Sequence, residues 1–75
     1  MKIGDIMKIS ARNMLKGNVK KIVAGSVNSE VTIVLPCGQE ITSIITKTSV
    51  ESLGLAVGKP AYAVIKSSEV MIAVD

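Results

Sequence analysis

Two short polar clusters interrupt an otherwise aliphatic sequence and carry residue types that bind anions. The first is Ser10-Ala11-Arg12-Asn13 and the second is Lys66-Ser67-Ser68. Arginine offers a rigid fork of donors, lysine a point charge and serine a rotatable O–H group. A tetrahedral dianion without a proton only accepts hydrogen bonds, so clusters of this kind suit it. Phosphate fits less well, because it keeps a proton part of the time and benefits from an acceptor.

Each cluster taken alone also has a simpler interpretation. The first could be a solvated arm before a strand, and the second an exposed hairpin turn. Thr46 and Ser49, two further hydroxyl residues, could serve only to cap a helix. The spacing of these residues therefore leaves both interpretations open.

Catalysis and metal binding by protein ligands have little support. The chain has no histidine and a single cysteine, so neither an acid–base pair nor a zinc site is easily built. Its serines lack a histidine to activate them. The acidic residues are scattered near turns and chain ends: Asp5, Glu30, Glu40, Glu51, Glu69 and Asp75. We expect a binding protein that is not an enzyme.

The composition favours a small oligomer. The chain has 75 residues, 48% of them hydrophobic, with Tyr62 as the sole aromatic residue. A chain this short has a marginal core, and one cysteine cannot form a disulfide within it. Some aliphatic side chains should therefore lie in subunit interfaces. The net charge of +3 favours anions in general, but one aromatic residue is too few for base stacking, which argues against nucleic acid.

The location expected from the sequence is cytoplasmic. No stretch approaches the roughly 20 apolar residues that cross a bilayer, and the first residues do not resemble a signal peptide. An unpaired cysteine is consistent with that compartment. We interpret residues 1–9 as an N-terminal arm and residues 10–75 as a single domain.

Turn signals divide the domain into five predicted strands. They run from Lys16 to Ala24, Glu30 to Leu35, Glu40 to Thr46, Ala61 to Lys66 and Val70 to Val74. The last two are apolar at nearly consecutive positions, which is typical of strands covered on both faces. In a small barrel that pattern again implies a partner subunit.

A short helix is predicted between the third and fourth strands. Thr48 and Glu51 fit a capping box, and Gly54 has the character of a helix stop. Five strands with one helical turn in this position predict an all-β fold, a small five-stranded Greek-key barrel of the OB type.

Four segments in register resemble the molbindin family, the stand-alone form of the TOBE domain. Ser-Ala-Arg-Asn-Met-Leu-Lys-Gly at 10–17 resembles the family's opening, and Ile-Thr-Ser-Ile-Ile at 41–45 its third strand. The segment 49–55 is similar to its short helix, and 64–72 to its closing hairpin. The resemblance covers roughly residues 8–75.

The resemblance implies a function that the composition alone does not give. Molbindins are OB-like barrels that bind molybdate and tungstate between the subunits of hexamers, here expected as a trimer of dimers. The side chains or backbone groups that would bind the anion are those of Ser10, Ala11 (backbone N–H), Arg12, Thr46, Ser49, Lys66 and Ser67.

Three functional hypotheses follow. The first is cytoplasmic storage and homeostasis of molybdate or tungstate by a homo-oligomer. The second is a molybdate-sensing regulatory module that acts through a partner protein. The third, an OB-type nucleic-acid binder, is disfavoured by the scarcity of aromatic residues.

Overall fold

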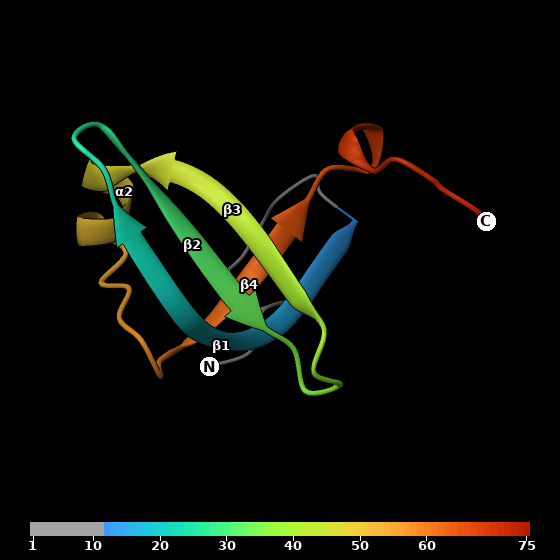
Figure 1. The fold of residues 1–75 in the computed structure, drawn as a ribbon, viewed down its shortest axis with the longest axis horizontal. Helices are drawn as coiled ribbons and strands as arrows, with labels where there is room; N and C mark the ends of the chain where they lie inside the picture. The colour runs from blue at the N-terminus through green and yellow to red at the C-terminus, as the bar shows by residue number, and fades with distance from the viewer. Residues whose placement is uncertain (1–11) are drawn as a thin grey trace.

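Four antiparallel strands form one curled sheet in residues 12–75, the part of the chain that the computed structural model describes. The spatial order is β3-β2-β1-β4, so the fourth strand lies beside the first, as in a Greek key (Figure 1). The elements are β1 (Asn13–Ala24), β2 (Asn28–Val34), β3 (Glu40–Thr46), helix α2 (Lys47–Ser52), β4 (Pro60–Ile65) and the 3-10 turn η1 (Ser67–Glu69). The prediction of an all-β fold with one short helix between the third and fourth strands is confirmed.

Strand β1 is the longest element and is shared by two partners. Its first half pairs with β4, from Asn13 opposite Ile65 to Asn18 opposite Pro60. Its second half pairs with β2, and the register shifts between Val19 and Lys21. A bulge of this kind bends a strand and increases its twist. The bend turns β4 away from the plane of β2 and β3, so the sheet curls toward a barrel (Figure 1).

Helix α2 begins one residue after β3, earlier than the capping box predicted. Thr46, not Thr48, is the N-cap, and its side chain accepts the N–H of Ser49 at 3.0 Å. The prediction of Thr48 as cap is therefore wrong. Thr46 is the last residue of β3 that pairs with β2, so the chain leaves the sheet there and the first threonine available becomes the cap.

The end of α2 follows the prediction. Gly54 has φ +64°, its N–H donates to the carbonyl of Glu51 at 3.1 Å, and the N–H of Leu55 donates to that of Val50 at 3.1 Å. These two bonds make a Schellman motif, which requires a left-handed residue after the helix. Glycine adopts that conformation without a steric penalty.

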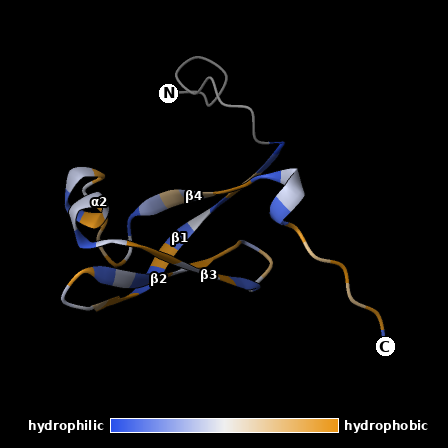
Figure 2. Ribbon diagram, turned by 90° about the horizontal axis from the view of Figure 1, so that it is seen from above, coloured by the Kyte–Doolittle hydropathy of each residue, from blue (hydrophilic) through white to orange (hydrophobic). Residues whose placement is uncertain are grey.

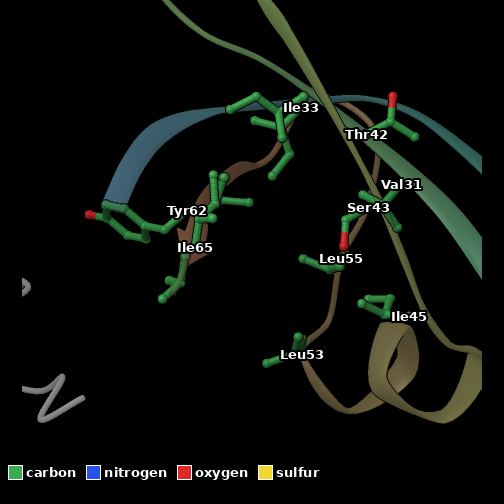
Figure 3. A pocket seen from close by; sticks show the side chains of 13 residues that line it. Val31, Ile33, Thr42, Ser43, Ile45, Leu53, Leu55, Tyr62 and Ile65 are labelled. Carbon is green, nitrogen blue, oxygen red and sulfur yellow. The ribbon is translucent and has the colours of Figure 1, made fainter. Parts of the chain in front are cut away.

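The core of the described chain is small. Only Val19, Val31, Ile33 and Ala63 are buried hydrophobic residues within residues 12–75. Mainly aliphatic side chains from β2, β3, β4 and the segment after α2 line an open apolar cavity of about 430 Å³ (Figure 3). No pairing joins β3 to β4 in the described residues, so the inner face of the sheet stays open between these two edges. We call this space the β3–β4 cleft.

The predicted fifth strand, Val70 to Val74, is absent from the structure. Residues 70–75 form no helix or strand and extend away from the sheet as a largely hydrophobic tail (Figure 2). The side chains of Met71, Ile72 and Val74 are 92%, 87% and 91% exposed. A strand needs a partner for its backbone hydrogen bonds, and within one described chain this segment has none. Residues 12–75 therefore form four of the five strands that the sequence predicts.

The sheet leaves no room for a side chain at Gly17, and we expect Gly17→Ala to destabilise the fold. A Cβ atom at Gly17 would lie 2.5 Å from the carbonyl oxygen of Val34 and 2.6 Å from Cγ2 of Ile33. Overpacking of this kind costs about 1–3 kcal/mol, more than the roughly 0.4–1 kcal/mol gained by restricting the unfolded chain. Urea unfolding should show a lower midpoint. Lys21→Ala, exposed on the same strand, should stay within about 0.5 kcal/mol of the parent, and equal stability of both variants would contradict this packing.

Candidate functional site

Arg12 and Lys66 are brought together at one corner of the sheet. Asn13 is opposite Ile65 in the last pair of the β1–β4 ladder, and Arg12 and Lys66 flank this pair, one directly before β1 and the other directly after β4. Opposite residues on antiparallel strands lie close enough for their side chains to interact. Both residues are exposed, so two positively charged residues that are far apart in the sequence flank the same end of the β1–β4 ladder.

Asn13 fixes this corner and was given no role by the sequence analysis. Its side-chain Nδ2 donates to the carbonyl oxygen of Ile65 at 3.3 Å. This bond ties the residue after Arg12 to the residue before Lys66. The sequence places Asn13 in the first polar cluster, which is the one sign that it could have a role. It does not show that the Asn13 amide reaches Ile65 on β4.

Ser67 lies next to Lys66, at the start of η1. The turn is closed by the N–H of Glu69, which donates to the carbonyl of Lys66 at 2.9 Å. Ser67 and Ser68 are exposed, and η1 contains no buried residue. Lys66 and Ser67 thus belong to the joint between β4 and the hydrophobic tail.

Thr46 and Ser49 form a second hydroxyl pair at the start of α2. Thr46 Oγ1 donates to Ser49 Oγ at 2.7 Å and accepts from the Ser49 backbone N–H. Helix capping therefore accounts for Thr46. The Ser49 hydroxyl accepts from Thr46 and keeps its own proton, for which no acceptor appears within residues 12–75. Ser49 can still donate a hydrogen bond to a ligand.

The two groups lie at opposite ends of the sheet. Thr46 is the pairing partner of Asn28, beside the end of β1, whereas Arg12 precedes its first residue. A strand of 12 residues covers roughly 35–40 Å of contour, and Figure 1 shows α2 and η1 far apart. One chain does not bring Ser49 to Lys66. Ser10 and Ala11, the remaining predicted ligands, lie outside the described residues.

The charges at the Arg12–Lys66 corner are not neutralised within the described chain. The ion pair found in residues 12–75 joins Lys20 to Glu40, on the other half of the sheet. In these residues no cluster of side chains is suited to hold a metal cation, and no helix is long and apolar enough to cross a bilayer. The corner offers donors and positive charge, which is the chemistry of an anion site.

Comparison with known proteins identifies the family. The model of the TOBE domain matches residues 9–72. The chain belongs to the TOBE domain family. A relative named as a probable molybdenum-pterin-binding protein of Haemophilus influenzae is 49% identical over 69 residues, 92% of this chain and 100% of the relative. The molbindin resemblance that the four sequence segments predicted is confirmed.

Solved TOBE structures share the fold. MopII from Clostridium pasteurianum matches with a TM-score of 0.84 at 48% identity, over 89% of this chain and all of that one. ModG, described as a cytoplasmic molybdate-binding protein and solved with molybdate bound, matches with a TM-score of 0.80 at 52% identity, over 85% of this chain and 45% of that one. A further relative, named molybdenum-pterin-binding protein 3 of Clostridium pasteurianum, is 48% identical over 66 residues, 88% of this chain and 97% of the relative.

The capping role of Thr46 leads to a prediction about stability. Thr46→Ala removes the side-chain acceptor of the Ser49 N–H and should lower the free energy of unfolding by about 1 kcal/mol. Thr46→Ser keeps an oxygen at the same position and should retain most of that stability. Urea unfolding of the two variants and the parent measures the difference. An alanine variant as stable as the serine variant would show that this hydrogen bond contributes little.

Proposed function

We propose that this TOBE protein binds molybdate and tungstate at the interfaces of a homo-oligomer and stores these anions in the cytoplasm. The observation that carries the proposal is the division of the donors. Arg12, Lys66 and Ser67 lie at one end of the sheet, and Thr46 and Ser49 lie at the other. A site that uses both groups requires at least two chains. The relative solved with molybdate and described as cytoplasmic supports the choice of ligand and compartment.

The donor chemistry fits a proton-free tetrahedral dianion. Two positive charges at the Arg12–Lys66 corner match a charge of −2, and hydroxyl and guanidinium groups supply hydrogen atoms to an ion that only accepts them. Neither cation makes an ion pair with a carboxylate in the described chain. Binding therefore does not have to break a salt bridge first.

The exposed tail and the β3–β4 cleft support assembly from several copies. The tail presents apolar side chains to water, and the cleft is lined mainly by aliphatic residues between two strand edges that lack a partner in residues 12–75. Unpaired edges recruit additional strands. In our proposal residues 70–74 of one copy supply the fifth strand of the OB-like barrel of another, and the assembly is a hexamer arranged as a trimer of dimers.

Storage follows from this arrangement. An anion held between subunits stabilises the associated state by mass action, since it binds the assembly better than the separate chains. The oligomer then takes up the anion when it is plentiful and releases it as its free concentration falls. This is the behaviour of a homeostatic buffer.

Titration calorimetry with molybdate, tungstate, sulfate and phosphate tests the proposal. Molybdate and tungstate should give saturable heat, and sulfate and phosphate should give much less. Arg12→Ala and Lys66→Ala each remove a charged donor and should weaken molybdate binding by on the order of 1.5–3 kcal/mol, the value of a hydrogen bond to a charged group.

The matched control for the charge is Lys59→Ala. Lys59 is exposed and lies just before the start of β4, at the end of that strand remote from Lys66. This variant loses the same charge and should keep the parent affinity. Unchanged affinity in both the Arg12 and Lys66 variants would place the anion elsewhere, and equal heat from sulfate would reject the assignment to molybdate.

Assembly through the tail predicts the effect of a charge at Ile72. In a separate chain this side chain is 87% exposed, so Ile72→Asp should cost little unless the side chain becomes buried on association. Burying an unpaired carboxylate is strongly unfavourable. We expect light scattering after size exclusion to show a fall from a multiple of 7.8 kDa toward that single-chain mass.

Ile72→Val provides the control for this experiment. It removes one methylene group, keeps the apolar character and should leave the assembly intact. If the aspartate variant elutes with the same mass as the parent, the tail is not part of the subunit interface.

A further inference from the structure

The joint between β4 and the hydrophobic tail contains two of the proposed anion ligands. Lys66 directly follows Ile65, the last residue of β4 that pairs with β1, Ser67 begins η1, and the tail starts directly after Glu69. We infer that Arg12, Lys66 and η1 form an anion-sensitive hinge, in which the bound dianion fixes the direction of the tail and slows its exchange between subunits. This inference rests on the proposed function and adds a kinetic role to the same site.

The hinge is held weakly by its own contacts. Of its two backbone bonds, the one from Val70 N–H to the Ser67 carbonyl is 3.4 Å long, beyond the usual 2.7–3.2 Å. Lys66, the residue that caps the turn, makes no side-chain capping bond, and no residue of η1 is buried. Segments with few buried contacts and exposed hydrogen bonds open at low cost in free energy. The turn can therefore change direction while β1 and β4 stay paired.

A dianion at this corner would act on both sides of the hinge. Arg12 comes directly before β1 and Lys66 directly after β4, and like charges on neighbouring strand ends repel each other. The carboxyl groups on the same stretch are those of Glu69 and Asp75, and neither forms an ion pair with these cations. A bound dianion attracts both Arg12 and Lys66 and so replaces their mutual repulsion. Lys66, the residue before η1, is then restrained next to the start of β1.

The consequence is a coupling between loading and subunit exchange. With the anion absent, the turn samples several directions and the tail leaves its partner readily. With the anion bound, the tail can leave its partner only if the anion dissociates or if the backbone of η1 beside the anion is distorted. The same coupling makes an assembled tail favour anion binding, because linkage between two sites is reciprocal.

Subunit exchange measured by native mass spectrometry tests the hinge. Unlabelled and nitrogen-15-labelled protein are mixed without anion, with tungstate and with sulfate, and the growth of mixed oligomers is followed. We expect tungstate at saturation to slow exchange by about tenfold or more, as expected when ligand stabilises one state, and sulfate to have little effect. Amide hydrogen exchange over residues 66–75 should slow in parallel.

Two serine-to-glycine variants separate the hinge from the ligands. Ser68→Gly keeps every proposed ligand but makes the turn more flexible, so exchange of the tungstate-loaded protein should accelerate by about two- to fivefold. Ser26→Gly makes the same change in the exposed turn between β1 and β2 and should leave exchange at the parent rate. Lys66→Ala should make exchange insensitive to tungstate.

The outcomes distinguish the two levels of the proposal. If calorimetry detects no tungstate binding, the proposed function fails and the hinge fails with it. If tungstate binds but the exchange rate changes less than about twofold, or if Ser68→Gly and Ser26→Gly behave alike, the hinge is rejected and anion binding stands. Slower exchange in tungstate, with acceleration by Ser68→Gly alone, supports the hinge.

Discussion

A sheet that curls without closing leaves its inner face half covered, and this constraint governs the rest of the molecule. The bulge after Val19 bends β1, which turns β4 out of the plane of its neighbours. Strands β3 and β4 are then the two edge strands of the curled sheet, and they do not pair with each other in the described residues. Four buried hydrophobic residues form the core of this part of the chain, and the partly exposed aliphatic side chains around the β3–β4 cleft remain in contact with water. Covering them would supply free energy for the association that we propose.

The same curl forms the corner of the sheet at which we propose that the anion binds. It places the start of β1 against the end of β4, so Arg12 and Lys66 flank the pair of Asn13 and Ile65, two residues that are 52 positions apart in the sequence. Each cation is hydrated and exposed, which keeps the cost of holding both at one corner low in the free chain. A dianion removes the repulsion between them. The free energy that the anion loses on dehydration is offset only if further donors complete the hydrogen bonds around it. Thr46 and Ser49 of the same chain are too remote to supply them.

The sequence predicted most of the backbone, because local signals determine it. The turn signals between the strands and the glycine at position 54 specify these elements without help from distant residues. Two threonines compete to cap α2, and only the end of the β2–β3 pairing decides between Thr46 and Thr48. The segment 70–74 has the composition of a strand, but composition does not supply a pairing partner.

The site was predictable only in part for a related reason. Residue types identify donors, and the β1–β4 register explains why the two polar clusters that contain them meet. Neither feature reveals that Asn13 secures the corner, nor that the capping residues face a different end of the sheet. Those facts depend on how far β1 extends and where it bends. Both are properties of the folded sheet, and no short motif encodes them.

Selectivity presents a last physical problem for this kind of site. Sulfate is also a proton-free tetrahedral dianion, so neither charge nor acceptor character distinguishes it from molybdate. The difference must come from size, which means that the donors have to be held at fixed separations. Within a chain, the bond from Asn13 to Ile65 and the cap between Thr46 and Ser49 fix each group locally. In the assembly that we propose, the separation between the two groups is set when chains associate. Selectivity between molybdate and sulfate is thus expected to arise with the assembly. A hinge that controls the direction of the tail would therefore also affect this selectivity.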